Sequence, residues 1–140
     1  MSNLKIVKQY IKELTIKGPS SPEVFANTQH KPNIEISINI DATKLSDLAY
    51  EVILQLKAVA DNGKLFETTV NYAAICYISK ESNPEDLEEI LLVECPNLLF
   101  PFSRAIISNL TSDAGFAPLM IDPIDFNSLY EKRRESFTIN

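Results

Sequence analysis

Residues 33–40 constrain the fold most, because polar and apolar side chains alternate strictly along them. The apolar positions are all isoleucine: Ile34, Ile36, Ile38 and Ile40. Successive side chains of a strand point to opposite faces, so this spacing predicts a strand with one apolar face. Each isoleucine contributes about 1.5 to 3 kcal/mol when fully buried. The chain must therefore supply a cover for this face, either helices or a second sheet.

Three more segments are predicted as strands. Residues 50–60 and 65–78 alternate in the same way, and Asp61-Asn62-Gly63 between them predicts a hairpin, because Asn-Gly accepts the positive φ of a type I′ turn. The apolar residues of segment 4–16 follow neither the period of two of a strand nor the period of about 3.6 of a helix cleanly. This segment is predicted as a strand that ends at Gly18-Pro19. A loop is expected over residues 24–32.

The distal half of segment 65–78 is apolar on both faces, where Ala73, Ile75 and Tyr77 share the second face. A strand buried on both sides needs helices on both faces of the sheet or another subunit. Oligomerisation is therefore predicted. A sheet wrapped by its own loops is the alternative.

A first helix is predicted from Asn83 to about Val93, because Asn83 can cap it and Pro84 fits its first turn. Six acidic residues and no basic residue lie from Glu81 to Glu94. Such a run is typical of a solvated face, and it is also a candidate contact for a basic partner.

The segment Cys95 to Arg104 holds two prolines and two phenylalanines in an apolar run. Pro101 suits the first position of a helix, and the residue before a proline is pushed towards extended geometry, so a helix is predicted from Pro101 to about Asp113. Phe100 and Phe102 are expected in the core. Gly115 is expected in the C′ position, where glycine ends helices.

Residues 116–124 form an apolar stretch bounded by prolines. Such a stretch is expected either to cover the core or to line a groove. Asp125 is predicted to cap a last helix from Phe126 to about Ser136, with Lys132, Arg133 and Arg134 at its negative end. The tail is expected to fray from about residue 137.

Length and charge narrow the classes of function. The 140 residues predict one domain, 1–140, that needs no metal or disulfide. A net charge of −6 argues against nucleic acid or an anionic membrane as partner and favours basic or zinc-bearing partners. No apolar run approaches the roughly 18 residues of a spanning helix, and Met1 to Lys12 lack a signal-peptide core, so a cytoplasmic protein is expected.

Residues suited to catalysis or metal binding are few. Cys76 and Cys95 are interpreted as small buried apolar groups rather than a disulfide, with a metal or redox role as the alternative. His30 has no ligand partner at the right spacing, and three glycines cannot build a phosphate loop. Asp122 and Asp125 suit turns and caps. No cofactor is expected, and an enzyme using Cys95 or an aspartate is a weak hypothesis.

A surface that binds is the remaining interpretation. Long strands, an apolar proline-bounded loop and aromatic side chains in both describe a groove for extended or unfolded peptide. Such a groove would hold apolar side chains, with backbone pairing at a sheet edge as a further contact. Binding of this kind has low sequence specificity.

The segment Cys95-Pro96-Asn97-Leu98-Leu99-Phe100-Pro101-Phe102-Ser103-Arg104 resembles the SecB signature Cys-Pro-x-x-Leu-Phe-Pro-(Tyr/Phe)-Ala-Arg, with serine in place of alanine. Residues 115–119, 123–126 with 129–130, and Tyr50-Glu51-Val52 are also similar to this family of bacterial export chaperones. The resemblance covers nearly the whole chain.

The resemblance implies an α+β fold: a four-stranded antiparallel sheet with helices packed on one face, assembled as a dimer of dimers. It also implies an ATP-independent chaperone that holds unfolded preproteins in apolar grooves and delivers them to the motor SecA. The implied groove residues are Phe116, Leu119, Met120 and Ile121, with Phe25 as a further candidate. A related chaperone or adaptor dedicated to one partner, such as an antitoxin, is the alternative.

In this family the zinc-bearing tail of SecA docks on acidic residues of the first and fourth strands. Glu13 matches one of these acids. Lys17 and Thr69 stand where family members often have glutamate, and Glu67, on the same strand face as Thr69, is the candidate replacement. Many relatives carry a tryptophan near the second strand, and this chain has none.

Overall fold

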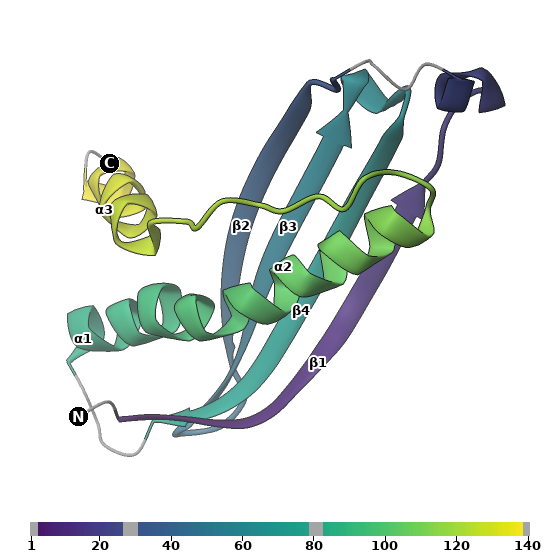
Figure 1. The fold of residues 1–140 in the computed structure, drawn as a ribbon. Coiled ribbons are helices and arrows are strands. Elements are labelled where there is room, and N and C mark those ends of the chain that lie inside the picture. Colours follow the sequence, from purple (N-terminus) through teal and green to yellow (C-terminus); the bar gives the residue numbers. More distant parts are fainter. Residues whose placement is uncertain (1–2, 27–30, 79–82, 139–140) are drawn as a thin grey trace.

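The computed structural model describes residues 3–26, 31–78 and 83–138. They form one antiparallel sheet with helices on one of its faces (Figure 1). The strands are β1 (Leu4–Lys17), β2 (Ile34–Lys44), β3 (Ala49–Ala60) and β4 (Phe66–Ile78), in the order β1-β4-β3-β2. The predicted α+β fold of the subunit and all four predicted strands are confirmed.

Strand β1 owes its irregular sequence pattern to two breaks in its pairing with β4. The register shifts between Ile6 and Lys8 and again between Ile11 and Glu13. Each bulge adds one residue to one strand, so the alternation of side chains restarts after it. Leu4 and Ile6 pack against the core under the helices, whereas Tyr10 bonds to Glu51 on the opposite face, so the apolar residues of β1 do not follow a strict period of two.

The hairpin between β3 and β4 exists, but its turn is not the predicted two-residue type I′. Ala60 pairs with Phe66, so residues 61–65 form the connection. Positive φ angles occur at Asp61, Asn62 and Gly63, at 50°, 55° and 90°. The Asp-Asn-Gly sequence thus supplies positive φ in a longer loop than expected.

One continuous helical segment crosses the sheet. It consists of α1 (Pro84–Glu89), the π-helical turn η3 (Ile90–Glu94) and α2 (Cys95–Asp113). Asn83 caps its start by accepting a hydrogen bond of 2.8 Å from the Asp86 N–H. The helix therefore begins where predicted and continues well past the predicted end.

The predicted helix start at Pro101 is wrong, because Pro101 lies inside α2 and Phe100 is helical. The helix also passes Pro96, which cannot donate a backbone hydrogen bond. The turn before it widens, and the Cys95 N–H bonds to the Ile90 carbonyl five residues back. The free energy gained by burying the inner face of the helix outweighs the backbone hydrogen bonds lost at the two prolines. A rule that considers only neighbouring residues does not include this burial.

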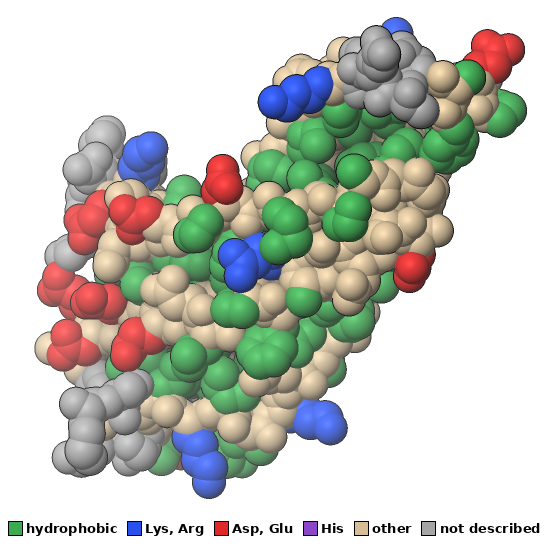
Figure 2. All heavy atoms as spheres, in the orientation of Figure 1, with side chains coloured by type: hydrophobic (Ala, Val, Ile, Leu, Met, Phe, Trp, Pro, Cys, Tyr) green, Lys and Arg blue, Asp and Glu red, His purple; other side chains and the backbone are tan. Residues whose placement is uncertain are grey.

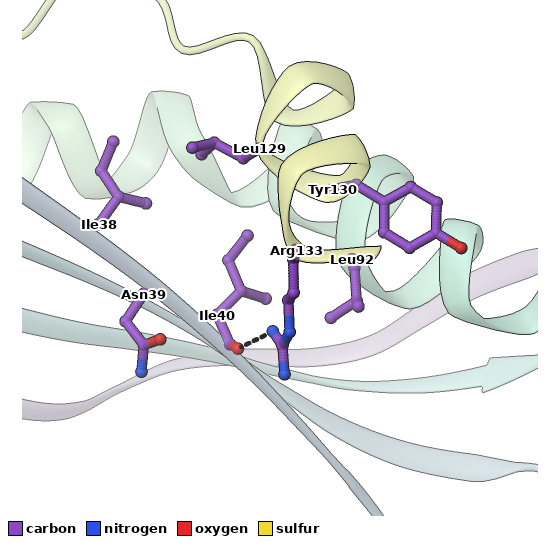
Figure 3. A pocket seen from close by; sticks show the side chains of 7 residues that line it. All are labelled: Ile38, Asn39, Ile40, Leu92, Leu129, Tyr130 and Arg133. Carbon is purple, nitrogen blue, oxygen red and sulfur yellow. Dashed lines mark hydrogen bonds between the residues drawn. The ribbon is translucent and has the colours of Figure 1, made fainter. Parts of the chain in front are cut away.

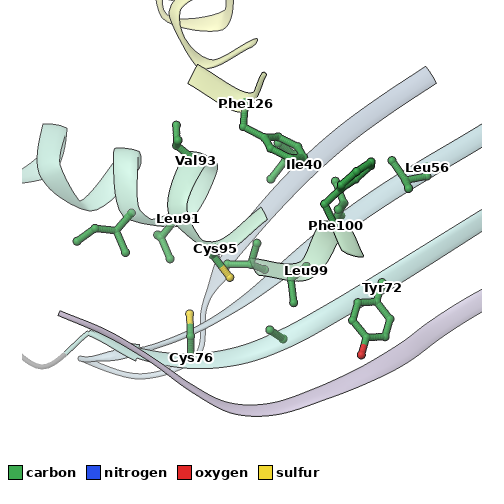
Figure 4. Packing of buried hydrophobic residues seen from close by; sticks show 14 of the residues in the cluster. Ile40, Leu56, Tyr72, Cys76, Leu91, Val93, Cys95, Leu99, Phe100 and Phe126 are labelled. Carbon is green, nitrogen blue, oxygen red and sulfur yellow. The ribbon is translucent and has the colours of Figure 1, made fainter. Parts of the chain in front are cut away.

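The main core lies between this helix and the sheet (Figure 4). Side chains that are fully buried in it include Val52, Leu54, Leu56, Val70, Leu99, Ile107 and Phe126. Phe100 is buried as expected and meets Phe126 edge to face, with ring centroids 6.2 Å apart. Phe102 is half exposed and stacks on Tyr72 at 6.1 Å, so its predicted place in the core is wrong.

Helix α2 ends with the predicted glycine. Gly115 has φ of 102°, the Gly115 N–H bonds to the Ser112 carbonyl, and the Phe116 N–H bonds to the Thr111 carbonyl. These two bonds define a Schellman motif with Gly115 at C′. The chain then runs back across the sheet towards the edge formed by β2 (Figure 1).

The last helix, α3 (Phe126–Thr138), lies beside the edge strand β2 (Figure 1). Asp125 caps it as predicted: its carboxylate accepts bonds from the Ser128 N–H at 3.1 Å and the Ser128 hydroxyl at 2.7 Å. These bonds lower the pKa of Asp125. The helix ends two residues later than predicted, and residues 139–140, like His30, lie outside the described part of the chain.

The surface of the helical layer is acidic at one end. Figure 2 shows acidic side chains gathered at the end where α1 lies, and Glu85, Asp86, Glu88 and Glu89 are all exposed. The helical stretch Pro84–Asp113 is long and apolar enough to span a membrane, with a window of mean hydropathy 1.5. Half of that window is buried in the protein, as in the core helix of a folded domain.

Candidate functional site

An apolar groove of about 380 Å³ opens at the end of the sheet where β4 begins. Loop, strand and connection residues all contribute to it. Its lining consists of Val24, Phe25, Pro32, Ile34, Leu65, Phe66, Gly115, Phe116, Ala117, Pro118 and Leu119. Because no lining side chain carries a charge, the groove suits apolar side chains of a ligand.

Three phenylalanines form the wall of this groove. The Phe116 ring lies between Phe25 and Phe66, with centroid distances of 5.2 Å and 5.1 Å. Phe66 is buried, Phe116 is partly buried and Phe25 is exposed. The cluster therefore leads from the core to the surface, and Phe116 is its central member.

A buried hydroxyl fixes the connection that carries Phe116. Thr111 is fully buried near the end of α2, and its hydroxyl donates to the Ile107 carbonyl at 2.9 Å. The same oxygen accepts a 2.9 Å hydrogen bond from the Leu119 N–H. Buried backbone donors need such partners. This side of the groove is thereby tied to the core helix.

Gly115 is required where the helix turns into the groove. Besides its positive φ, a Cβ built on Gly115 would lie 3.0 Å from Cε1 of Phe25. A side chain here would strain the backbone and push Phe25 away from the groove. The glycine thus serves both the helix end and the aromatic wall.

Gly115→Ala is therefore expected to lower the free energy of unfolding by about 1 to 2 kcal/mol. Urea denaturation measures this change. Gly18→Ala is the matched control, because a Cβ at Gly18 meets no atom within 4 Å. Equal stability of the Gly115 and Gly18 variants would contradict this role of Gly115.

The structure brings together three of the five predicted groove residues. Phe25, Phe116 and Leu119 all line the groove. Met120 is 61% exposed and lies outside the lining, whereas Ile121 is only 6% exposed and packs in the main core. Ile121, predicted as a groove residue, therefore lies in the core and not in the lining, and Met120, predicted likewise, lies outside the lining on the solvent side.

Two important lining residues were not predicted. Ile34 reaches the groove from β2, and Phe66 reaches it from the start of β4. Ile34 begins the row of isoleucines and Phe66 follows the hairpin. The sequence therefore predicted each of them as part of a strand, and nothing in it indicated a groove. Only the sheet pairing places both beside Phe116.

A second cavity of about 180 Å³ lies between β2 and α3 (Figure 3). Its lining consists of Ile38, Asn39, Ile40, Leu92, Leu129, Tyr130 and Arg133. Two polar bonds hold α3 beside it. The Arg133 guanidinium donates to the Ile40 carbonyl at 3.0 Å, and the Tyr130 hydroxyl donates to Glu88 at 3.3 Å.

The predicted acidic contacts lie on the opposite, open face of the sheet. Glu67 forms an ion pair of 3.0 Å with Lys57 and pairs across the strands with Lys17. Glu13 accepts a 3.4 Å hydrogen bond from Asn71, which is four residues, or about 13 Å, from Glu67 along β4. The two acids share a face without forming one compact acidic patch.

A third acid on the open face is already paired. Glu51 accepts hydrogen bonds from the Tyr10 hydroxyl and, at 2.8 Å, from Lys12. The bonds from Lys12 and Tyr10 lower the pKa of the Glu51 carboxyl. Burial and the bond to Glu51 raise the pKa of Tyr10 to about 12. The negative charge of Glu51 is therefore balanced locally by Lys12.

The two cysteines are buried free thiols that face each other across the core (Figure 4). A hydrogen bond with Cys76, and then burial, raise the pKa of the Cys95 thiol far above its usual range. A protonated buried thiol is a poor nucleophile. Within the described residues, no group of three His, Cys, Asp or Glu side chains could hold a metal. The interpretation as buried apolar groups is confirmed.

Cys95→Ser is expected to cost about 1 to 3 kcal/mol of folding free energy, because it buries a more polar group, and to leave binding intact. Thermal unfolding and a peptide-binding assay on the same sample measure both. Loss of all binding by a variant that is still folded would restore the hypothesis of a reactive Cys95.

Comparison with known proteins decides the family. The SecB family profile, described as "Preprotein translocase subunit SecB", matches residues 1–136. The chain belongs to the SecB family. A protein of Rickettsia bellii (strain OSU 85-389) named "Protein-export protein SecB" is 43% identical over 136 residues, covering 95% of this chain and 89% of that protein. The SecB of Rickettsia typhi (strain ATCC VR-144 / Wilmington) is 43% identical over 139 residues, with the same coverage.

Solved structures agree with the SecB fold. A SecB-like chaperone of Mycobacterium tuberculosis, in complex with a ChAD peptide from an antitoxin, has a TM-score of 0.65 at 15% identity and matches 86% of this chain and 87% of its own. A Streptococcus agalactiae protein of unknown function has a TM-score of 0.50 at 11% identity, matching 86% and 97%. Similarity at these identities supports the fold alone.

Family membership sets the general class of activity. SecB proteins are export chaperones without enzymatic activity, so the chain is a SecB chaperone and not an enzyme. The predicted resemblance is confirmed, and the hypothesis of an enzyme using Cys95 or an aspartate is rejected.

Proposed function

We propose that this protein is an ATP-independent holdase of the cytoplasm that binds unfolded preproteins and delivers them to SecA. The observation that carries the proposal is the apolar groove around Phe116, in which three aromatic rings lead from the core to the surface and no lining side chain is charged. A groove that recognises apolar side chains accepts many unfolded chains and few folded ones. Binding of this kind requires no nucleotide.

Client contact is assigned to Phe25, Phe116 and Leu119. Met120 lies just beyond them and is exposed, so it adds an adaptable apolar side chain to the rim. Ile121 supports the same connection from the core. The client is expected to leave these side chains in place and cover them.

SecA is proposed to dock on the open face of the sheet through Glu13 and Glu67. Glu67 already forms an ion pair with Lys57. Among the contacts of the described residues, Glu13 accepts only a hydrogen bond from the Asn71 amide. Glu13 is therefore the stronger contact for a basic or zinc-bearing tail. Lys17 beside Glu67 further weakens that half of the surface.

The assembly is proposed to be a homotetramer, a dimer of dimers. Leu98 and Phe102 support this, because both are large apolar side chains, about half exposed and one helical turn apart on α2. Light scattering is expected to give a mass near four times 15.7 kDa. A monomer at micromolar concentration would contradict the tetramer.

One experiment separates general export from service to a single partner. The purified protein is incubated with a chemically unfolded preprotein without nucleotide, aggregation is followed by light scattering, and capture of SecA is measured in parallel. Suppressed aggregation with SecA capture supports the proposal. Capture of one folded protein such as an antitoxin, without SecA, would favour the alternative, which the peptide bound to the M. tuberculosis SecB-like chaperone keeps open.

A further inference from the structure

Strand β2 is an edge strand, so half of its backbone groups point away from the sheet. The odd-numbered residues bond to β3: at one end the Asp61 N–H donates to Asn33, and at the other the Leu45 N–H donates to Ala49, both at 2.8 Å. The register is uninterrupted between these ends. The even-numbered residues therefore turn their N–H and C=O groups to the free edge.

From residue 34 to residue 40, these even-numbered residues are the four isoleucines of β2. Ile34 lines the large groove, and Ile38 and Ile40 line the second cavity. The free edge from Ile34 to Ile40 spans about 20 Å and runs from the groove to the second cavity. An extended polypeptide could pair with this edge while its alternate side chains enter the groove and the second cavity.

Arg133 occupies the far end of this edge. Its guanidinium donates to the Ile40 carbonyl at 3.0 Å (Figure 3), at the position that the N–H of an added strand would take. A cationic donor makes a stronger hydrogen bond than a neutral amide. Helix α3 thus covers the edge at Ile40, and no hydrogen bond from the described residues reaches the free edge at Ile34, Ile36 or Ile38.

We propose that Arg133 competes with bound polypeptide for the edge of β2 and sets where pairing stops. An extended client segment pairs with Ile34, Ile36 and Ile38, and it reaches Ile40 only after the guanidinium has left. This inference rests on the proposed function and makes it more specific. The preferred segment is an extended one with apolar residues at alternate positions.

The test uses the full-length protein and a synthetic ten-residue peptide with leucine at every second position and serine or lysine between. Amide hydrogen exchange is read residue by residue by NMR. The peptide is expected to slow exchange at 34, 36 and 38 and to leave Ile40 unchanged. In Arg133→Ala, slowing extends to Ile40 and affinity rises about three- to tenfold, because one competing bond is gone.

Two control variants separate this effect from a general loosening of α3. Lys132→Ala removes a neighbouring exposed charge, and Asp125→Ala weakens α3 by removing its N-terminal cap, without touching the second cavity or freeing the Ile40 carbonyl. Both are expected to bind the peptide like the unmodified protein. A peptide with N-methyl groups at its pairing positions cannot donate hydrogen bonds to β2. Its affinity should therefore be the same for the Arg133→Ala variant as for the unmodified protein.

The inference is overturned if the peptide binds without slowing the even-numbered amides, or if Asp125→Ala raises affinity as much as Arg133→Ala. In both cases binding itself survives, and with it the proposed function. A peptide and an unfolded preprotein that both fail to bind would instead overturn the holdase proposal together with this inference.

Discussion

Phe116→Asp is expected to weaken binding of unfolded polypeptide at least tenfold while the protein remains folded. The substitution removes the central ring of the Phe25–Phe116–Phe66 cluster and places a charge in an uncharged groove. A charge that loses its water on client binding costs several times more than the lost apolar contact. Fluorescence titration with a labelled unfolded preprotein measures the affinity.

Leu45→Asp is the matched control for Phe116→Asp, because Leu45 is 53% exposed in the turn after β2, away from the groove. It should bind like the unmodified protein. Met120→Asp is expected to weaken binding less than Phe116→Asp, since Met120 lies outside the lining. Unchanged affinity in both the Phe116 and Met120 variants would place the client site elsewhere.

Leu99→Ala is expected to lower the free energy of unfolding by about 2 to 5 kcal/mol. Leu99 is fully buried and points from α2 towards the sheet (Figure 4), so its removal leaves a cavity that the rigid sheet cannot fill. Urea denaturation at fixed protein concentration, followed by circular dichroism, measures the change.

Leu98→Ala is the control for Leu99→Ala, because the neighbouring Leu98 is 51% exposed. Its effect on the stability of the subunit should stay within about 0.5 kcal/mol. A lower mass of the Leu98→Ala variant in solution would place Leu98 in a subunit interface, as the tetramer proposal expects. Equal destabilisation by the two variants would contradict the packing described for α2.

Strands were predictable where alternation is undisturbed. The isoleucines of β2 and the apolar positions of β3 and β4 are repeated every second residue, and the turn signal Asp61-Asn62-Gly63 marks their pairing. The faces of β1 were not readable, because two bulges shift its side chains. Pairing with β4 determines the bulges, and a single strand does not reveal its partner.

Local rules for proline failed in the long helix. Pro101 is a good first residue for an isolated helix, yet the core buried by Leu99, Phe100 and Ile107 holds the chain helical on both sides of it. A rule that considers only neighbouring residues omits this tertiary contribution. The widened turn before Pro96 has the same origin.

The groove was predicted in part. The connection after Gly115 was expected to line a groove, and Phe116 and Leu119 do so. Met120 and Ile121 differ in burial because one faces solvent and the other the core, and a continuously apolar run contains no period that separates them. Phe25 and Phe66 come from distant segments that only the fold brings together.

The central claim is that the groove holds unfolded chains without nucleotide, and one measurement tests it most directly. Light scattering follows the aggregation of an unfolded preprotein after dilution, with no ATP, in the presence of either this protein or its Phe116→Asp variant. The account predicts that the unmodified protein suppresses aggregation at equimolar tetramer and that the variant does not. Identical aggregation with the unmodified protein and with buffer alone would contradict it.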